Sequence, residues 1–470
     1  MRTRRRRERE NRETSDAQAF EGARAIGAAF GSEAPPMKHV EAAHLVRPDE
    51  GRINRRIYGD PDVYDLEQER IFARCWLFIG HESQVRKPGD FVTTYMGADP
   101  VILTRDQDGR TGVFLNNCPH RGRQVCELDR GNQRLFVCPY HGWSFRSNGE
   151  LAAVPYLKEA YYGELDRSQF GLKRCPQVDT YRGLIFATWD PDAPSLRDYL
   201  GEMAWYLDIA LDRSAAGTEL IGPPQKFRIK ANWKTGAENF ISDFSHAQTI
   251  AHASAFKLSG GAGEAPPDGG AQANPGPGHG LFMYLGRNSL GYTTGKHIEM
   301  HLPEARERLG DLRAGGYIDI AAGTVFPNLS FNLMPTISDL RVWMPRGPHE
   351  MEVWTWGLVD AGVPDEVKAQ MYQSFQRAFG AAGMLEQDDG DHWQSITTSA
   401  QGTVSRNEWN HLGMGLGHEF FRDDLPGQLG LLISEANARA FYRRWRDLIV
   451  AERWDELASS THYALAEAQL

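Results

Sequence analysis

The spacing of hydrophobic residues changes several times along the chain and predicts both helices and strands. In residues 61–80, Val63, Leu66, Ile71 and Phe72 recur at helical spacing, which predicts a helix. Residues 90–117 contain short β-rich runs separated by Gly-Ala-Asp and Asp-Gly turns, the pattern of an antiparallel meander. Further strands are predicted at 182–190, 323–335 and 351–359.

Helical spacing returns in the second half of the chain. A helix is predicted to begin near 195, and residues 227–254 pass from strand to helix near Thr235. Residues 365–379 also have helical spacing, and Phe441, Trp445, Leu448 and Ile449 follow one face of a last helix. Between these regions, residues 259–280 contain eight Gly and four Pro, which predicts a flexible loop. The mixture of elements predicts an α+β protein.

Composition places the chain among soluble globular proteins. It has 470 residues, of which 41% are hydrophobic and 24% charged. A net charge of −10 argues against general nucleic-acid binding. No run of 18 apolar residues is present, so no membrane span is expected. The five cysteines, an odd number, do not resemble a disulfide framework, and the expected compartment is the cytoplasm.

Residues 1–38 form an arginine-rich N-terminal tail. The first 13 residues hold seven Arg, and no apolar periodicity or secretory signal follows. This composition predicts a disordered tail. The arginines are also compatible with a basic arm for an anionic partner, and Met37 is a plausible true start of the chain.

Two loops carry an unusual combination of cysteine and histidine. Cys118 and His120 form Cys-x-His, and after 17 residues Cys138 and His141 form Cys-x-x-His. Zinc fingers usually pair ligands of one type in each loop, whereas here each loop offers one thiolate and one imidazole. That arrangement suits a [2Fe–2S] cluster whose two irons have unlike ligands, and it resembles a Rieske centre. Respiratory Rieske proteins carry an additional cysteine in each loop, and these cysteines are absent here. Because fewer hydrogen bonds to the cluster sulfurs are then expected, the sequence indicates a reduction potential in the lower part of the Rieske range, about −150 mV.

A second metal site is indicated more than a hundred residues later. His246 and His252 are six residues apart, about 120° around an ideal helix, so the helix must bend or end if both bind one metal. The acidic run at 384–393 offers a carboxylate as third ligand. Two histidines and one carboxylate on one face of Fe(II) leave positions open for O₂ and water.

These motifs resemble one family closely. The runs "CPHRG…CPYHGW", "NWK…EN…D…H…H" and "FGAAGMLEQDDGDHW" are similar to those of the large (α) subunits of aromatic-ring-hydroxylating Rieske non-haem iron dioxygenases, the biphenyl, toluene and naphthalene dioxygenase group. The resemblance spans about residues 40–460. It implies that His246, His252 and Asp389 hold a mononuclear iron, with Asp388 as the competing acid, and that Asp243 links this iron to the cluster of a neighbouring subunit. Ser245 departs from the family, which usually has Tyr there.

The resemblance also implies a division into domains. After the tail, residues 39–90 form a helical segment that packs on the catalytic domain, 91–175 an all-β Rieske domain, and 176–470 a catalytic domain with an antiparallel sheet flanked by helices. The expected substrate pocket is apolar and includes Asn239, Phe240, Phe244, Phe331, Leu333, Phe379, Met384 and Leu385.

The implied activity is cis-dihydroxylation of an aromatic ring with O₂ and electrons from NADH. The implied partners are a small β subunit in an α₃β₃ assembly, a ferredoxin and a flavin-dependent NADH reductase. No Arg or Lys occurs in the pocket segments, which disfavours a carboxylated substrate such as phthalate, although Lys257 keeps that substrate class open. The motifs also leave open a ring monooxygenase of the same family, a pure electron-transfer protein and a structural zinc protein.

Overall fold

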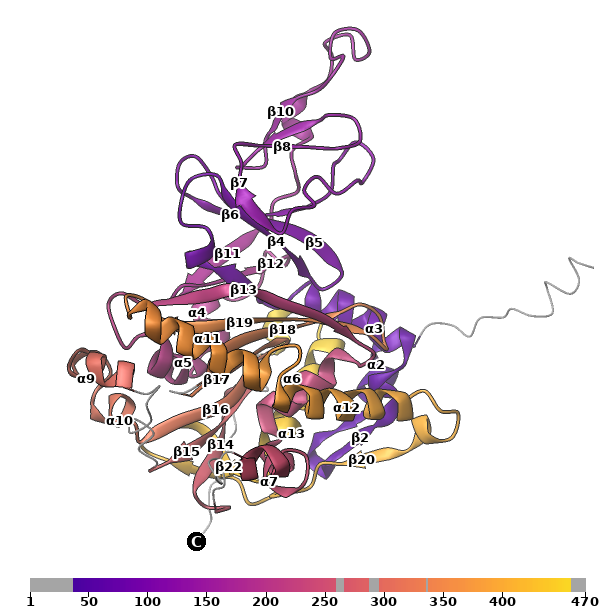
Figure 1. Ribbon diagram of the computed structural model, residues 1–470. Helices are drawn as coiled ribbons and strands as arrows, with labels where there is room; N and C mark the ends of the chain where they lie inside the picture. Colours follow the sequence, from indigo (N-terminus) through magenta and orange to yellow (C-terminus); the bar gives the residue numbers. More distant parts are fainter. Residues whose placement is uncertain (1–36, 259–265, 287–295, 335–336, 458–470) are drawn as a thin grey trace, which may run out of the picture. The chain divides into compact units, whose positions relative to one another are not determined.

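The computed structural model describes residues 37–258, 266–286, 296–334 and 337–457 (Figure 1). One compact unit begins at His39 and contains both helices and antiparallel sheets. The arginine-rich tail predicted at 1–38 lies, apart from Met37 and Lys38, outside the described residues. The α+β class is confirmed for the rest of the chain.

The segment before the first large sheet is mixed rather than helical. Its helices are α2 (His39–Ala43) and α3 (Pro61–Glu67), which continues as a π-helical turn to Phe72, and its strands are β1 (Val46–Arg47), β2 (Arg52–Asn54) and β3 (Leu77–His81). The helix predicted over 61–80 is therefore wrong beyond Phe72, because all five residues of β3 are buried as a sheet strand. Strand β2 pairs with the distant β20 (Trp409–His411), which joins this segment to the C-terminal part.

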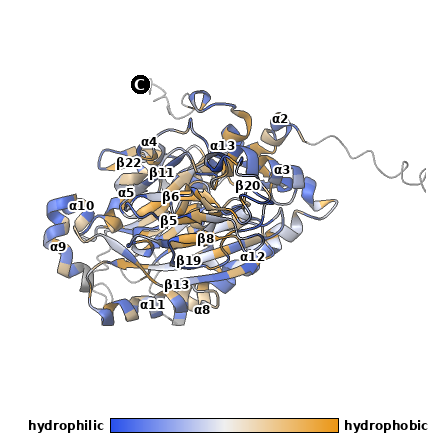
Figure 2. Cartoon of the chain, turned by 90° about the horizontal axis from the view of Figure 1, so that it is seen from above, coloured by the Kyte–Doolittle hydropathy of each residue, from blue (hydrophilic) through white to orange (hydrophobic). Residues whose placement is uncertain are grey.

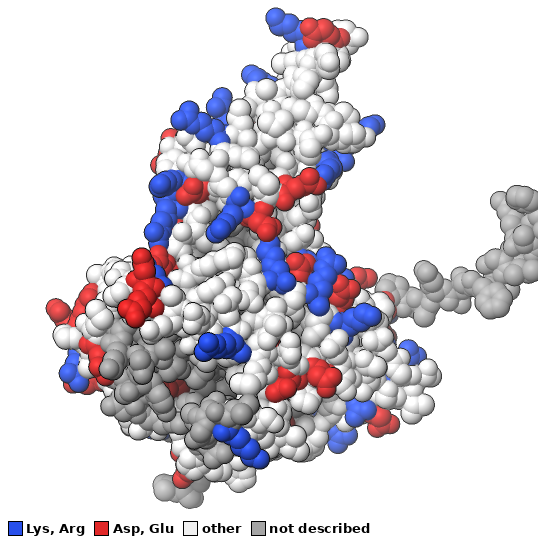
Figure 3. All heavy atoms as spheres, in the orientation of Figure 1, with Lys and Arg blue, Asp and Glu red and all other residues white. Residues whose placement is uncertain are grey.

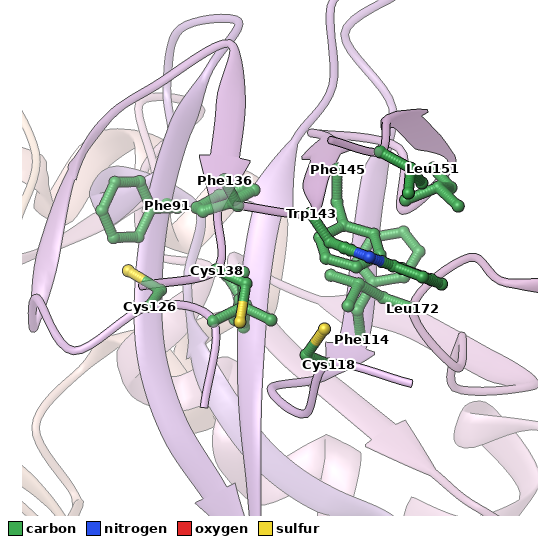
Figure 4. Close-up of a cluster of buried hydrophobic side chains, with 13 residues drawn as sticks. Phe91, Phe114, Cys118, Cys126, Phe136, Cys138, Trp143, Phe145, Leu151 and Leu172 are labelled. Atoms are coloured by element: carbon green, nitrogen blue, oxygen red, sulfur yellow. The ribbon is translucent and has the colours of Figure 1, made fainter. Parts of the chain in front are cut away.

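The meander predicted at 90–117 is confirmed. Strands β4 (Asp90–Met96), β5 (Asp99–Arg105), β6 (Thr111–Leu115) and β7 (Arg130–Asn132) form one sheet in the order β6-β5-β4-β7. A second small sheet holds β8 (Leu135–Val137), β9 (Ser144–Arg146) and β10 (Leu151–Ala153). A third pairs β3 with β12 (Leu184–Thr188) and β11 (Gln177–Tyr181). The first two sheets enclose a core that contains Phe114, Trp143 and Phe145 (Figure 4).

The catalytic half is built on a nine-stranded antiparallel sheet in the order β13-β19-β18-β17-β16-β15-β14-β22-β21. Its strands are β13 (Thr218–Ile229), β14 (Gly270–Gly276), β15 (His279–Leu285), β16 (Ile318–Val325), β17 (Leu329–Leu333), β18 (Ser338–Pro345), β19 (Met351–Asp360), β21 (Phe420–Arg422) and β22 (Leu425–Leu431).

The loop predicted at 259–280 is wrong from residue 270 onward. Residues 270–276 and the start of β15 are buried inside the sheet, while 259–265 lie outside the described residues. A Cβ atom at Gly270 would lie 2.1 Å from the carbonyl oxygen of Met283 on the paired strand. Gly270 therefore permits close strand packing rather than loop flexibility.

Helices flank the sheet, as predicted. They include α4 (Leu196–Leu200), α5 (Met203–Leu211), α6 (Trp233–Ser242), α9 (Lys296–Leu309), α10 (Asp311–Ala314), α11 (Asp365–Phe379), α12 (Met384–Ser399) and α13 (Ala436–Val450). The four apolar residues predicted on the last helix are all fully buried in α13. Figure 2 shows hydrophobic residues concentrated in the strands and hydrophilic ones along the outer helices α9 to α11.

The two faces of the catalytic sheet have different neighbours. Trp343 of β18 contacts Phe240 of α6 and Trp393 of α12, with ring centroids 5.5 and 5.0 Å apart. On the opposite face, Trp356 of β19 contacts Phe78 of β3 at 5.9 Å. The sheet therefore separates α6 and α12 from strand β3.

Glu67 fixes the N-terminal segment to the catalytic helices. Its buried carboxylate accepts hydrogen bonds from Trp233 Nε1 (2.7 Å) and Lys234 Nζ (2.6 Å) at the start of α6, and from Trp445 Nε1 (2.8 Å) of α13. Burial of an ion pair costs desolvation free energy, which these additional hydrogen bonds help to offset. The start of α6 is therefore held from two directions.

None of the described helices is long and apolar enough to cross a membrane. Figure 3 shows Lys and Arg interspersed with Asp and Glu on the face it presents, without a broad basic surface.

Candidate iron centres

The two Cys/His loops have the same backbone geometry. In each, a glycine four residues after the cysteine donates its N–H to the cysteine carbonyl, Gly122 to Cys118 at 2.8 Å and Gly142 to Cys138 at 3.0 Å. Both glycines have positive φ, 71° and 73°, which closes the tight turn. The two loops therefore share the same turn, and each presents one cysteine and one histidine.

The four side chains of these loops are brought together. Cys118 and Cys138 are each 2% exposed, and Figure 4 shows them on facing loops. The rings of His120 and His141 are 4.6 Å apart between centroids, and His120 stacks on Trp143 at 5.0 Å with nearly parallel planes. All four cysteines and histidines predicted to bind the cluster thus lie in one place, whereas Cys126 lies beside Phe91 in Figure 4.

Their chemistry fits a Rieske cluster. Burial and the adjacent Cys138 sulfur raise the pKa of the Cys118 thiol, while backbone N–H groups of His120 and Arg121 donate toward its sulfur and oppose that rise. His120 Nδ1 is buried and has no hydrogen-bond partner among the described residues, as expected of a nitrogen intended for a metal. Two thiols and two imidazoles in contact would hold a [2Fe–2S] cluster.

His246 lies within a short helix, and His252 lies in the break that follows this helix. Helix α6 ends at Ser242, α7 (Phe244–Thr249) begins immediately afterwards, and α8 (Ala253–Leu258) follows His252. Asp243 caps both ends of the first break, with φ −91° and ψ 66° outside the helical region. Because α7 ends at Thr249, between the two histidines, the helix end required by their six-residue spacing is also present.

Three side chains converge beside the break between α7 and α8. The Nε2 atoms of His246 and His252 are 3.1 Å apart, and Asp389 Oδ1 lies 3.1 Å from the first and 3.2 Å from the second. His246, His252 and Asp389 each offer one ligand atom, and these three atoms lie within 4.8 Å of one another, close enough to hold a metal ion. Atoms about 2.1 Å from a metal and at right angles to each other lie about 3.0 Å apart. The triangle therefore fits three ligands on one face of an octahedral metal.

The adjacent acid occupies a different position. Asp388 Oδ2 lies 3.3 Å from His252 Nδ1, on the side of the ring opposite the cluster of ligand atoms, and its side chain is 42% exposed. Asp389 has a 3% exposed side chain, and its Oδ1 faces the Nε2 atoms of both histidines. This geometry favours Asp389 as ligand and Asp388 as the residue that orients His252.

Protonation at the site is governed by these contacts. Burial by itself would lower the pKa of His246, but hydrogen bonds with Asp243 and Asp389 raise it to about 10. Burial would raise the pKa of Asp389, but hydrogen bonds from the two histidines lower it to about 2. The carboxylate is therefore charged at neutral pH, as a metal ligand must be.

Asp243 has local partners and a partly exposed side chain. Its carboxylate accepts from the His246 backbone N–H (3.3 Å) and from Ser245 Oγ (3.1 Å), and lies 3.5 Å from His246 Nδ1. Its side chain is 44% exposed. Burial opposes ionisation, but the bonds from His246 outweigh it and lower the pKa of Asp243. Ser245 therefore supports Asp243 in this chain.

The residues expected to form the substrate pocket are only partly brought together. Asn239 Nδ2 lies 3.5 Å from His246, and Phe240 lies 6.1 Å from Phe379 between ring centroids. Phe244 packs instead on β15, 5.5 Å from the rings of Phe282 and Tyr284. Phe331 and Leu333 are buried in β17 and Leu385 is half-buried. Met384 is 45% exposed, which does not fit the wall of an enclosed pocket.

Sequence reasoning missed a cation at this site. Arg341 of β18 is fully buried and its guanidinium carbon lies 4.1 Å from the Phe240 ring centroid. It pairs with Asp339 and with Glu386. The sequence did contain a signal for this ion pair. Asp339 and Arg341 carry opposite charges two residues apart in an otherwise apolar strand, and residues with this spacing share one face of a strand.

A β-domain with a two-loop Cys/His site and a sheet-and-helix domain with two histidines and one aspartate define a Rieske oxygenase. Comparison with protein families agrees. The model of the Rieske [2Fe-2S] domain matches residues 75–181, and that of the ring hydroxylating alpha subunit catalytic domain matches residues 196–451. The chain belongs to the family of ring-hydroxylating dioxygenase α subunits, which are oxidoreductases with a Rieske cluster and a non-haem iron.

Curated relatives share about two-fifths of its residues. The α subunit of benzene 1,2-dioxygenase from Pseudomonas putida is 41% identical, over 90% of this chain and 96% of that protein. The α subunit of biphenyl 2,3-dioxygenase from Rhodococcus jostii is 40% identical, over 94% and 98%. The crystal structure of naphthalene 1,2-dioxygenase from Rhodococcus sp. bound to indole matches with a TM-score of 0.79 and 37% identity, over 90% and 99%.

Proposed function

We propose that this chain is the terminal oxygenase subunit that adds both atoms of O₂ to one face of an uncharged aromatic ring. The product is a cis-dihydrodiol, and the balance is one ring, one O₂, two electrons and two protons. The electrons come from NADH through a flavin-dependent reductase and a ferredoxin, and the chain assembles with a small β subunit as α₃β₃. The proposed compartment is the cytoplasm.

One observation carries the proposal. A two-histidine, one-carboxylate triangle with edges of 3.1–3.2 Å occurs in the same chain as a Rieske domain. When bound, the cluster would supply electrons singly and the iron would activate O₂. A pure electron-transfer protein would not need the matched catalytic domain, and a structural zinc site would not need unlike ligands in each loop.

The protein's own residues determine what reaches the triangle. Cys118, His120, Cys138 and His141 would hold the cluster, and His246, His252 and Asp389 the iron. Asn239 limits the space next to His246, and Phe240 and Phe379, 6.1 Å apart between ring centroids, are the apolar rings proposed for the pocket wall. These side chains suit a flat hydrocarbon ring. Asp243 is the proposed link for electrons between subunits, because its carboxylate contacts His246 and is partly exposed.

An uncharged ring is favoured over an aromatic carboxylate. Lys257, the cation that kept a carboxylated substrate open, is exposed. Arg341 is buried near the proposed pocket but is already paired with two carboxylates. A substrate carboxylate would have to displace one of them, which costs the desolvation of a buried charge.

Turnover of a substrate panel tests the proposal. The chain, co-expressed with its β subunit and supplied with ferredoxin, reductase and NADH, is given benzene, biphenyl, naphthalene and phthalate under ¹⁸O₂. We expect a cis-diol with two labelled oxygens from a hydrocarbon and none from phthalate, with about three irons per α chain. The variant His246→Ala is the control and should lose product while keeping the red-brown cluster spectrum. Incorporation of a single labelled oxygen would favour a ring monooxygenase.

A further inference from the structure

Arg341 contacts three helices that carry Asp389 and residues of the expected pocket. Its Nη2 donates to Asp339 Oδ1 at 2.8 Å on the same strand, and its Nη1 donates to Glu386 in the first turn of α12. Its guanidinium carbon lies 4.1 Å from the ring centroid of Phe240 on α6 and 5.0 Å from that of Phe379 at the end of α11. One side chain thus contacts α6, α11 and α12.

Glu386 connects this cation to the iron triangle through the helix. It lies three residues before Asp389, so the two carboxylates share one face of α12, and both are buried. Burial raises the pKa of Glu386 to about 7; Arg341 opposes that rise and the charge of Asp389 adds to it. Glu386 therefore lies close enough to sense both Arg341 and the candidate ligand.

Helix α12 needs such an anchor at its start. Its N-cap, Gly383, provides no side-chain hydrogen bond, and the first residue, Met384, is largely exposed. The Arg341–Glu386 pair is a buried polar contact between this first turn and the sheet. A shift of the first turn would move Asp389, which lies one turn later, relative to the two histidines.

We propose that Arg341 is a positioning residue, which fixes Glu386, Phe240 and Phe379 and so sets both the position of Asp389 and the wall of the substrate pocket. The inference rests on the proposed function for the pocket, but its effect on the metal site does not depend on the substrate. Without the guanidinium, two buried carboxylates would face each other near Asp389, and the two phenyl rings would lose the cation on which they pack.

The test compares Arg341→Met with Glu386→Met and the double variant in the assembled enzyme. Fe(II) affinity is measured by chelator competition, cluster integrity by visible spectrum, and the regioisomers of the diol by chromatography. We expect Arg341→Met to weaken Fe(II) binding about tenfold and to change the regioisomer ratio, with an unchanged cluster spectrum. If Arg341 acts through Glu386, the double variant should bind Fe(II) no more weakly than the single ones.

A matched control separates positioning from general stability. Arg74 is also a buried arginine, paired with Asp190 and bonded to the carbonyl of Ala451 at 2.7 Å, and none of these contacts involves the iron triangle. Arg74→Met should lower the melting temperature while Fe(II) affinity and regioisomers stay as in the wild type. Equal Fe(II) affinity and regioisomers in Arg341→Met and Arg74→Met would overturn the proposal.

Conservative variants keep the proposal testable if Arg341→Met does not fold. Arg341→Lys retains the charge but cannot bridge Asp339 and Glu386 in the same planar geometry, and Glu386→Gln retains the shape. Both should weaken Fe(II) binding several-fold, and wild-type affinity in both would overturn the proposal. A failure of the proposed function would be seen separately, as wild-type enzyme that binds Fe(II) normally but oxidises no aromatic hydrocarbon.

Discussion

Asp388 and Asp389 are neighbours in the sequence but have different surroundings in α12. Asp389 faces the two histidines, whereas Asp388 reaches only the outer nitrogen of His252. Asp389→Asn removes the charge needed to hold a divalent cation, so we expect loss of Fe(II) and of product. Asp388→Asn keeps the ligands and should lower Fe(II) affinity about 10–100-fold at most. Iron analysis after gel filtration checks both, and the opposite ranking would assign the ligand to Asp388.

His279 makes the stability of the fold sensitive to acid. The ring is fully buried; its Nδ1 accepts from the Phe326 N–H (3.0 Å) and its Nε2 donates to the Tyr199 carbonyl (2.8 Å). Burial lowers the pKa of His279 to about 4, and the nearby Arg444 adds to this effect.

Because the folded pKa of His279 is below the ordinary value of about 6.5, the unfolded state binds more protons between these pH values. The free energy of unfolding is therefore undiminished above pH 6.5 and should fall by up to about 3 kcal/mol as pH drops towards 4. His279→Asn keeps a donor and an acceptor but does not titrate, so its urea midpoint should decline less steeply over this range. Burial also lowers the pKa of His81 to about 4. His81 should therefore leave the variant with part of the decline in urea midpoint at low pH. Identical slopes for the two proteins would contradict the prediction.

At the scale of elements, the break between α6 and α7 is the most informative feature of the chain. Asp243 occupies this break, where it caps α7 and contacts His246. The structure gives Asp243 local contacts with His246. Its side chain is 44% exposed, which leaves room for the proposed contact with a second subunit. These two roles predict different results for one substitution.

Asp243→Asn retains the shape but removes the charge and one acceptor. If Asp243 links subunits, iron should remain fully bound while reoxidation of the reduced cluster by O₂ and substrate becomes slow. If it serves only to orient His246, iron occupancy should fall and reoxidation should slow only in proportion. A single-turnover experiment with iron analysis distinguishes these outcomes. Normal reoxidation at full iron occupancy would exclude both roles.

Sheet strands β14 and β15 show how composition misleads at this scale. Glycine and proline in 270–280 predict a loop, yet these residues pair with β16 and β22 in the middle of the sheet. A second wrong prediction concerns Leu77–Gly80, which was predicted to be helical but forms a buried strand. In both cases contacts with residues far away in the sequence outweigh local preference.

At the scale of the whole molecule, the described unit begins at His39, after the arginine-rich tail. A chain that begins at Met37 should therefore keep its cluster spectrum, assembly and turnover, because residues 1–36 contain no core-forming pattern. Gel filtration with the proposed β subunit and turnover of the hydrocarbon that the wild type oxidises check this. Loss of activity or of assembly would show that the arginines bind an anionic partner.

The sequence by itself determined the chemistry of both centres. The paired Cys/His loops and the two histidines with a downstream acid are recognisable because metal ligands must be particular residue types at particular spacings. Periodicity likewise predicted the meander, helix α11 over 365–379 and the buried face of α13, since these elements follow local patterns.

Only the tertiary structure showed the different surroundings of the two acids, placed strands in the glycine-rich segment and revealed Arg341. The phase of α12 is set by its packing on the sheet, so adjacent aspartates cannot be separated without it. Arg341 comes to the site from β18 by way of strand pairing, and its partner Glu386 is 45 residues away in the sequence. Ligand type is a property of single residues, but which side chains share a buried volume depends on long-range packing, which no local pattern contains.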